Sequence, residues 1–326
     1  MTDAAGPIFV GGLDRSGTSL MYALLASHPE IAMTRRTNWW TYFHGRFGDL
    51  AKDEHLDRLL DEMLRYRRHR KLEPDREALR AAFRAGSPRD ARLFALMEEQ
   101  FAARMGRSRW GDKSLHTERY AADVYEEFPT ASILHMIRDP RDRYASVLKR
   151  WKRVRGGVGG ATAAWLASVA LGDRNAARYP DRYRVVRYED LAARPVEVMQ
   201  EICTFIGVPF EPVMMEMRGA ETFREAGNSS YGAIPEGTIS TRSIGRYREV
   251  MSAADVRFLQ GRAGNAMLAH GYGLDPVDMS PPEGLRYRFV RLPLEGVRMA
   301  AWRGREWVRD RLGRAAPGHT MLDGDR

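Results

Sequence analysis

The sequence is poor in cysteine. Cys203 is the only cysteine in 326 residues, so no disulfide can form within the chain, and nothing points to an oxidising compartment. No cluster of Cys and His residues has metal-ligand spacing, so we expect no metal site. No apolar run approaches the roughly 20 residues of a membrane span. The opening residues also lack a cationic leader before a long apolar stretch, so we expect a cytoplasmic protein without a signal peptide.

Acidic residues are also in deficit. Asp and Glu number 43 against 52 Lys and Arg, which gives a net charge of +9. Such an excess suits nucleic acid, an anionic membrane or a phosphorylated ligand. The arginines gather in "RDPRDR", in "TRSIGRYR" and along the C-terminal tail. Because these stretches lack the interleaved aromatics of an RNA-binding sheet and any helix-turn-helix pattern, we expect no nucleic-acid binding.

Short apolar runs alternate with stretches of helical period. "IFV", "SILHMI" and "YRVVR" are typical of buried strands. Helices are predicted over 18–27, 53–70, 88–107, 161–178 and 196–206, from about Arg141, and from a cap at Ser252 to about 270. This alternation predicts an α/β fold with a central parallel sheet flanked by helices, in three layers.

The chain is predicted to divide into an α/β domain over 1–275 and an arginine-rich extension over 276–326 that we expect to be helical. "RGGVGG" (155–160) is interpreted as a flexible break, and the run over 226–245 as a functional loop or lid. In the tail, Val297, Ala301, Val308 and Leu312 fall on one helical side. That side would lie on an anionic membrane or grip a partner; alternatively the helix packs back on the domain.

The first strand runs into a glycine-rich loop that lacks a lysine. Residues 12–17 have the spacing of a phosphate loop, but Thr18 stands where a nucleotide-hydrolysing loop has its lysine. Backbone amides in such a turn, backed by a helix N-terminus, bind an anion without any particular side chain. Without the lysine, the clamp on a γ-phosphate is missing. The residues predicted to bind the anion are Arg15, Ser16, Gly17, Thr18 and Ser19.

A second anion site is predicted where "SILHMI" ends. Arg138 leaves this strand, and Ser146 lies eight residues on, within the next helix. Both side chains can converge on one anion above the carboxyl edge of the sheet. Two such sites suit a nucleotide that carries separate 5′ and 3′ phosphates. The alternative is that Arg138 and Asp139 merely pair with Arg141 and Asp142 at a solvated turn.

Together these residues resemble the sulfotransferases that use 3′-phosphoadenosine-5′-phosphosulfate (PAPS). "DRSGTSLMYALLASHPEI" resembles their 5′-phosphosulfate loop, and "IRDPRDRYAS" resembles their 3′-phosphate motif. The connecting segments resemble the family as well, in "WGDKSLHTERYAADVYEEFP", "YEDLAARPVEVMQEICTFIGVP" and "SIGRYRE". The resemblance covers about 8–272 and excludes the tail. It implies a P-loop-like fold and transfer of a sulfuryl group from PAPS to a hydroxyl or amine, releasing adenosine 3′,5′-bisphosphate without a metal.

The resemblance also implies roles for individual residues. Arg15 would stabilise the leaving phosphate oxygen, and Lys113 the transferring sulfuryl group. Arg138 and Ser146 would hold the 3′-phosphate. Tyr188 is expected on the adenine side, or alternatively is a tyrosine buried under that turn, and contacts to the adenine or the 3′-phosphate are expected from Ser229, Arg242 and Gly245.

One departure concerns the general base. Related enzymes often carry a glutamate after the segment matching "HPEI", but this sequence continues "AMTRRTNWW" without a carboxylate. His116 is the first candidate for the base, with Asp112 and His44 as others. The neighbouring aromatic residues either line an acceptor pocket or form a hydrophobic plug: Trp39, Trp40, Tyr42 and Phe43.

Two other functions compete with this interpretation. A small-molecule kinase would need a lysine in the loop and a Mg²⁺-binding aspartate, for which only Asp139 offers itself. A non-catalytic protein that retains a PAPS pocket would account for the missing glutamate, although Arg15 and Lys113 are retained. The acceptor is left open between a sugar, a lipid, a peptide and an aromatic metabolite.

Overall fold

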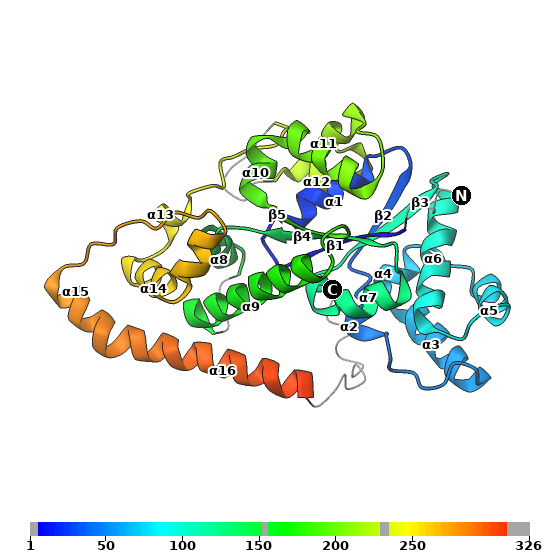
Figure 1. The fold of residues 1–326 in the computed structure, drawn as a ribbon, viewed down its shortest axis with the longest axis horizontal. Helices are drawn as coiled ribbons and strands as arrows, with labels where there is room; N and C mark the ends of the chain where they lie inside the picture. Colours follow the sequence, from blue (N-terminus) through cyan, green and yellow to red (C-terminus); the bar gives the residue numbers. More distant parts are fainter. Residues whose placement is uncertain (1–5, 152–155, 229–234, 312–326) are drawn as a thin grey trace.

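A five-stranded parallel sheet forms the centre of the molecule (Figure 1). The computed structural model describes residues 6–151, 156–228 and 235–311. The strands lie in the order β2-β3-β1-β4-β5, and every pairing is parallel. Their bounds are β1 Ile8–Gly12, β2 Ile31–Arg35, β3 Arg109–Lys113, β4 Ser132–Ile137 and β5 Tyr183–Arg187. Since all strands run the same way, their carboxyl ends meet at one edge.

Helices make up most of the rest. In chain order they are α1 Thr18–Ala26, α2 Trp39–Tyr42, α3 Asp53–Arg65, α4 Arg67–Arg70, α5 Arg76–Arg84, α6 Asp90–Arg104, η1 Thr117–Tyr120, α7 Ala121–Glu127, α8 Pro140–Arg150, α9 Gly157–Arg178, α10 Tyr188–Ala193, α11 Pro195–Ile206, η2 Pro212–Glu216, η3 Arg218–Ala220, α12 Glu221–Ala226, α13 Tyr247–Val250, α14 Ala253–Ala269, α15 Pro281–Arg286, η4 Tyr287–Arg291 and α16 Leu292–Arg311.

The two faces of the sheet are covered by different helices. Figure 1 shows α1, α10, α11 and α12 on one face and α7 and α9 on the other. Alternate side chains of β1 enter different cores, because Ile8 and Val10 pack with α1 and α11 whereas Phe9 packs with α3, α6 and α7. The strands of a parallel sheet are apolar on both sides for this reason. The predicted three-layer α/β architecture is confirmed.

The sequence did not reveal β2, and one predicted break is wrong. Gly157–Gly160 do not form a flexible break, because they are the first turn of α9. A Cβ atom at Gly159 would collide with the backbone carbonyl of Glu295 in α16. The glycines therefore let α9 and α16 approach closely. Elsewhere the predicted helix over 53–70 divides into α3 and α4 at Tyr66, whose ψ of 117° is extended.

The aromatic residues after β2 form the hydrophobic plug. Trp39, Trp40 and Phe43 are at most 2% exposed, and Trp39 stacks on Phe43 and Phe94 with ring centroids 5.4 and 5.1 Å apart. Offset stacking of this kind stabilises a core beyond simple burial. Their place in the core excludes the acceptor-pocket alternative for these three rings.

The arginine-rich segment is helical from Pro281 to Arg311 and lies along α9 (Figure 1). Its inner side carries Glu295, which is 1% exposed and accepts a hydrogen bond from the Gly159 amide at 3.0 Å. Met299 is buried beside it. Over the described residues, no helix combines the length and apolar character that crossing a membrane requires.

Candidate active site

The loop between β1 and α1 has a backbone that requires glycine. Gly17 lies at φ 92°, in the left-handed region, and a Cβ atom there would come within 2.5 Å of the Tyr188 ring. The amides of Thr18 and Ser19 belong to the first turn of α1, whose N–H groups have no partner inside the helix. They therefore form an anion-binding end. Ser16 is 1% exposed, and its amide donates to the Leu13 carbonyl at 3.3 Å, which shapes the turn.

Arg138 brings the second predicted anion site against this loop. Its guanidinium lies 4.5 Å from the centre of the Tyr188 ring and donates to the carbonyls of Arg15 and Ser243 at 3.2 and 2.6 Å. The side chain is buried, yet its Nε has no hydrogen-bond partner among the residues that the structure describes. A buried donor without a partner costs free energy unless a ligand satisfies it.

These groups surround one cleft of about 300 Å³. It lies over the carboxyl ends of β1, β4 and β5, where open α/β sheets bind ligands. The lining residues are Arg15, Gly17, Thr18, Ser19, Leu20, Arg138, Arg150, Tyr188, Phe223, Ala226, Gly227 and Asn228. We call this the first cleft. It combines helix amides, hydroxyls and three arginines, so it suits an anion-bearing ligand.

Other predicted nucleotide contacts lie just outside this cleft. Ser146 is buried in α8 and accepts a hydrogen bond from Arg15 Nε at 2.9 Å. Gly245 donates its amide to Asp142 at 2.6 Å. Arg242 is exposed and borders a different hollow near α10. Ser229 lies outside the described residues.

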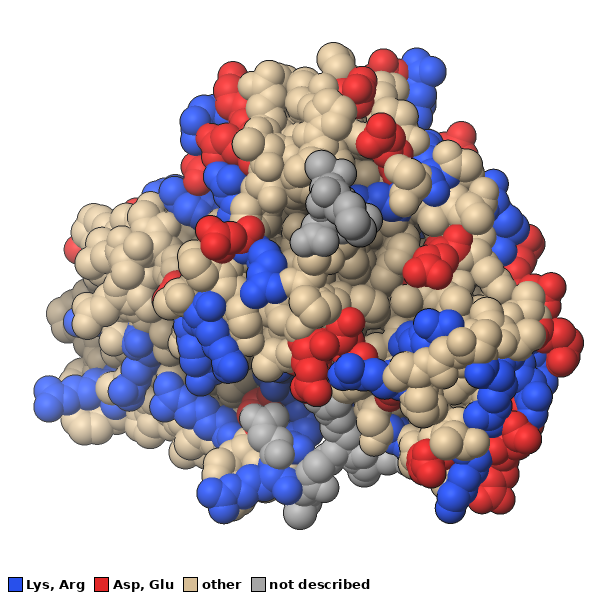
Figure 2. Space-filling view, turned by 45° about the vertical axis from the view of Figure 1, so that its right-hand side comes forward, with Lys and Arg blue, Asp and Glu red and all other residues tan. Residues whose placement is uncertain are grey.

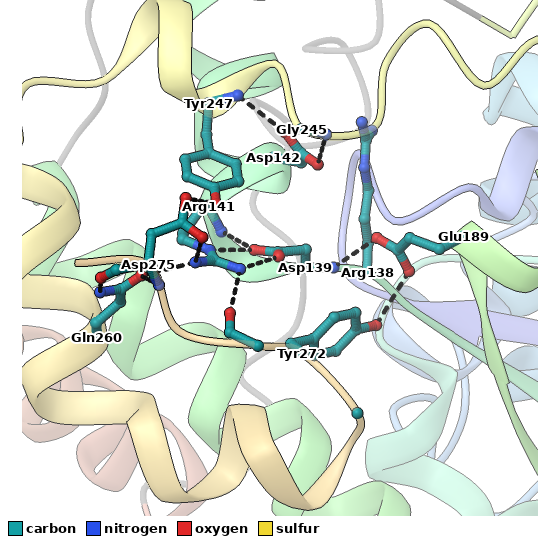
Figure 3. A network of polar contacts seen from close by, with 12 residues as sticks. Arg138, Asp139, Arg141, Asp142, Glu189, Gly245, Tyr247, Gln260, Tyr272 and Asp275 are labelled. Carbon is teal, nitrogen blue, oxygen red and sulfur yellow. Dashed lines mark hydrogen bonds and ion pairs between the residues drawn. The ribbon is translucent and has the colours of Figure 1, made fainter. Parts of the chain in front are cut away.

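The "RDPRD" segment holds the C-terminal loops over the site (Figure 3). Asp139 caps α8 and accepts two hydrogen bonds from the Arg141 guanidinium, at 3.0 and 2.6 Å. Arg141 also donates to the Gly273 carbonyl at 2.8 Å, and Asp142 accepts the amides of Gly245 and Tyr247. One alternative from the sequence is that Arg138 and Asp139 pair with Arg141 and Asp142 at a solvated turn. Asp139 does pair with Arg141, but the turn is buried, and Arg138 lies over the Tyr188 ring instead.

Lys113 ends β3 and is almost fully buried. Burial, together with the charges of Arg36, Arg35 and Arg68, lowers the pKa of Lys113 to about 8, against an opposing effect of Asp112. The ammonium therefore stands in a strongly cationic corner at the carboxyl edge of the sheet. Such a corner attracts an anionic group.

His116 lies between β3 and η1, at φ 64°, and its amide donates to the carbonyl of Gly12 at the start of the loop between β1 and α1. Its side chain is 40% exposed, and Nδ1 lies 3.9 Å from Glu118 Oε1. Burial lowers the pKa of His116 below its ordinary value of 6.5, although Glu118 opposes this. Burial alone would raise the pKa of Glu118, but His135, His116 and hydrogen bonds lower it on balance. The imidazole is therefore neutral and the carboxylate charged near pH 7.

A second cleft of about 330 Å³ opens beside His116. Its polar walls include Asp14, Arg119, Arg143 and Arg309, and its apolar walls include Trp151 and Trp302. Leu13 and Asp14 border this cleft while Arg15 borders the first. Consecutive residues of one loop thus border the two clefts.

The other two candidates for the base do not reach either cleft. Asp112 is fully buried and accepts a hydrogen bond from Thr34 at 3.2 Å. His44 pairs with Asp90 at 2.8 Å. His116 is the only one of the three proposed bases that borders a cleft.

Sequence reasoning missed several residues of the site. Ser243 accepts from Arg138 through its carbonyl and shares a 2.7 Å hydrogen bond with the Tyr188 hydroxyl. Asn228 donates to the same hydroxyl at 3.2 Å. Both lie in irregular loops, where no period marks them. Glu118 could have been suspected from its place two residues after His116.

Two sequence relatives of this chain are named sulfotransferases. The chain is 27% identical over 217 residues to the protein-tyrosine sulfotransferase of Drosophila melanogaster, covering 64% of this chain and 39% of that protein. It is 26% identical over 162 residues to human carbohydrate sulfotransferase 3, covering 44% of this chain and 33% of that protein. The chain therefore spans well under half the length of these two relatives.

Solved structures share the fold. The sulfotransferase domain from the Synechococcus PCC 7002 olefin synthase superposes with a TM-score of 0.52 at 20% identity, covering 84% of this chain and 98% of that domain. The sulfotransferase domain from the curacin biosynthetic pathway gives 0.53 at 16% identity, with 83% and 99% covered. The predicted P-loop-like fold is confirmed. A family model described as "Sulfotransferase family" matches residues 7–212, and because this match spans more than half of the chain, the protein belongs to the sulfotransferase family.

Proposed function

We propose that this protein transfers the sulfuryl group of PAPS to a hydroxyl or amine acceptor and releases adenosine 3′,5′-bisphosphate. The observation that carries the proposal is the first cleft. There a phosphate loop without a lysine stands beside a buried arginine whose Nε has no partner within the described chain. A nucleotide with a 5′-phosphosulfate and a 3′-phosphate supplies one anion for each.

The residues present fit this donor. The amides of Thr18 and Ser19, with their hydroxyls, would bind the 5′ group at the start of α1. Arg138 would bind the 3′-phosphate, and its unpartnered Nε would be satisfied by that contact. The edge of Tyr188 and the loop at Asn228 would border the adenosine. Ser146 would act through Arg15, which it holds at 2.9 Å.

The transfer itself needs positive charge at two places. PAPS supplies an activated sulfur, and its bond to the bridging phosphate oxygen breaks as the acceptor oxygen or nitrogen bonds to sulfur. Arg15, at the border of the first cleft, would stabilise charge on the leaving oxygen. Lys113 would stabilise the sulfuryl oxygens, for which it must be protonated.

His116 would accept the acceptor proton. The Glu118 carboxylate, 3.9 Å from Nδ1, favours the imidazolium that forms when the ring takes the proton, although Nδ1 has no hydrogen-bond partner among the described residues. The lowered pKa of His116 keeps the imidazole neutral and able to act as a base at neutral pH. Glu118 is itself too buried to meet a substrate and would act only through its charge.

The kinase alternative is less well supported. Its magnesium-binding aspartate would have to be Asp139, whose two carboxylate oxygens accept hydrogen bonds from Arg141. Its phosphate-clamping lysine would have to stand at Thr18. The binding-protein alternative leaves His116 and Lys113 without a task.

The acceptor would enter the second cleft, on the His116 side of the loop. The indoles of Trp151 and Trp302 suit an aromatic or sugar ring. The arginines of this cleft pair with its own carboxylates, Arg119 and Arg309 with Glu306 and Arg143 with Asp14. The relatives act on protein tyrosine and on carbohydrate by name. A tyrosine peptide is therefore the first acceptor to test, and a sugar the second.

Calorimetric titration tests the donor site. Adenosine 3′,5′-bisphosphate, 5′-AMP and Mg·ATP are titrated into wild type, Arg138→Ala and Arg138→Lys, with Arg65→Ala as the control because Arg65 is 66% exposed on α3. Wild type and the control should prefer the bisphosphate. Arg138→Ala should weaken the binding of the bisphosphate by about 10- to 100-fold, as expected for hydrogen bonds to a charged group worth about 1.5–3 kcal/mol. Arg138→Lys keeps the charge and guards against a folding defect.

Three results would contradict the assignment in different ways. Equal binding of all three nucleotides would mean that the protein has no specific site for the 3′-phosphate. Preference for Mg·ATP would favour the kinase. Tight bisphosphate binding without any turnover of labelled PAPS on the acceptors would favour the binding protein.

A further inference from the structure

The outward side of α16 is apolar although it faces solvent. The residues on the side away from α9, which we call the outer face, are Pro293, Leu294, Val297, Ala300, Ala301, Gly304, Trp307 and Val308, and all are exposed. Val297 is 66% and Trp307 56% exposed. Helical period places these residues opposite Glu295 and Met299, which are buried against the domain.

The apolar surface continues into the preceding turns. Leu285, Phe289 and Val290 are 61%, 68% and 54% exposed. Single exposed apolar side chains are ordinary in soluble proteins. A run of them along three successive helical segments is not, and such surfaces mark interaction sites.

Positive charge flanks this apolar face. Residues 281–311 contain eight arginines and four acidic residues. Glu295 is buried, and Glu306 pairs with Arg119 and Arg309. Two of the four acidic residues are thereby taken up by other contacts. Arg291, Arg298 and Arg309 are ion-paired as well, whereas Arg303 and Arg305 are exposed beside the outer face. Figure 2 shows blue side chains along the lower left of the molecule, where Figure 1 places α15 and α16.

We propose that the outer face of α16, with the exposed residues of α15 and η4, docks on the surface of an anionic lipid bilayer. Val297, Trp307 and Val308 would enter the region between headgroups and acyl chains, and the arginines would contact lipid phosphates. A second copy of the chain is a poorer occupant, because symmetric pairing would bring two arginine-rich helices together. The inner side of the same helix supplies Trp302 and Arg309 to the second cleft, so docking would hold that cleft beside the lipid surface.

Co-sedimentation of the full chain with lipid vesicles tests this. One set of vesicles is phosphatidylcholine alone, and the other contains about one third phosphatidylglycerol. We expect binding to the anionic vesicles that weakens as salt is raised, and little binding to the neutral ones. The double variant Val297→Glu/Val308→Glu should bind at least about tenfold more weakly, because it places charge in the apolar face. Arg303→Ser/Arg305→Ser should lower both affinity and salt dependence.

The matched control is Val196→Glu/Val213→Glu. These valines are 40% and 36% exposed and lie in α11 and η2, on the other side of the sheet, so this variant should bind vesicles like wild type. Circular dichroism establishes that each variant is folded. Absence of vesicle binding by wild type, or equal binding by the two glutamate variants, would overturn the proposal. So would dimerisation of wild type that Val297→Glu/Val308→Glu abolishes, since it would make the face an interface between copies. None of these readouts depends on sulfuryl transfer.

Discussion

At the scale of single residues, Gly17 determines how the loop between β1 and α1 packs against Tyr188. Its φ of 92° is costly for any residue with a Cβ atom, and the Tyr188 ring fills the space where that atom would go. Gly17→Ala should therefore lower the free energy of unfolding by about 1–2 kcal/mol or more and weaken adenosine 3′,5′-bisphosphate by at least about tenfold, because the amides of Thr18 and Ser19 shift. Chemical denaturation and calorimetry measure the two effects.

Gly261→Ala is the matched control. Gly261 lies inside α14, and its Cβ atom would meet nothing within 4 Å. Alanine should stabilise this helix by up to about 1 kcal/mol without changing nucleotide affinity. If both variants behaved alike, the special conformation of Gly17 would not matter for the site.

The pH dependence of kcat/KM follows from two side chains with lowered pKa values. His116 must be neutral to accept a proton, so activity should rise with pH through the pKa of His116, which lies below 6.5. Lys113 must be protonated, so activity should fall as pH passes about 8. The profile is thus bell-shaped and reports the free enzyme. His116→Ala should lose the acidic limb and about 10²–10⁴ of the rate.

Lys113→Arg gives the second half of this test. A guanidinium stays protonated, so its variant should retain activity above pH 8 if positive charge is all that position supplies. An unchanged alkaline limb in Lys113→Arg would mean that another group titrates there. An unchanged acidic limb in His116→Ala would remove His116 as the base.

The sequence identified residues whose chemistry is tied to a motif. Arg15, Thr18, Arg138 and Tyr188 come from three strand ends and border one cleft. The sequence could not show that the Ser146 hydroxyl accepts a hydrogen bond from Arg15, because that contact joins the loop between β1 and α1 to helix α8. Such partners depend on packing between elements, which a motif does not encode.

At the scale of elements, the errors have a common physical origin. A run of glycines predicts flexibility, but Gly157–Gly160 begin α9 because α16 packs on them. β2 carries Thr34 and Arg35 among its five residues, so it does not have the continuous apolar run of a buried strand. Its threonine is buried against Glu98 and Asp112. Tertiary contacts override local preference in both cases.

Asp142 links α8 to the loop that follows α12. It accepts the half-buried amide of Gly245 and the buried amide of Tyr247, at 2.6 and 2.9 Å (Figure 3). Asp142→Ala leaves both without a partner, at about 1–3 kcal/mol each. It should also weaken bisphosphate binding, because nearby Ser243 holds Arg138. Thermal and chemical denaturation with calorimetry measure this.

Ser252→Ala separates the loop from general instability. Ser252 caps α14 by accepting the Asp255 amide at 3.2 Å, so its loss should cost about 1 kcal/mol without touching the loop. Equal loss of nucleotide affinity in Asp142→Ala and Ser252→Ala would trace the effect to stability alone.

At the scale of the whole molecule, the two clefts draw on partly different segments of the chain. The first cleft is lined by residues 15, 17–20, 138, 150, 188, 223 and 226–228. The second adds Trp302, Glu306 and Arg309 from α16, which lies beyond residues 7–212 matched by the family model. Most other residues of both clefts lie within the matched segment, although Phe223 and residues 226–228 of the first cleft follow it. The part that α16 contributes is therefore confined to the second cleft.

Two tryptophans on α16 test whether the second cleft takes the acceptor, as proposed. Trp302 is half-buried and borders the second cleft, whereas Trp307 is 56% exposed on the outer face. Trp302→Ala should raise KM for the acceptor that labelled PAPS identifies by about tenfold, as expected for removing a ring worth about 1–1.5 kcal/mol of stacking, while bisphosphate affinity stays the same. Trp307→Ala, which removes the same side chain from the same helix, should leave both unchanged in solution. Equal KM values for the two variants would place the acceptor elsewhere, whereas loss of bisphosphate affinity in Trp302→Ala would mean that α16 supports the whole site rather than the acceptor cleft alone.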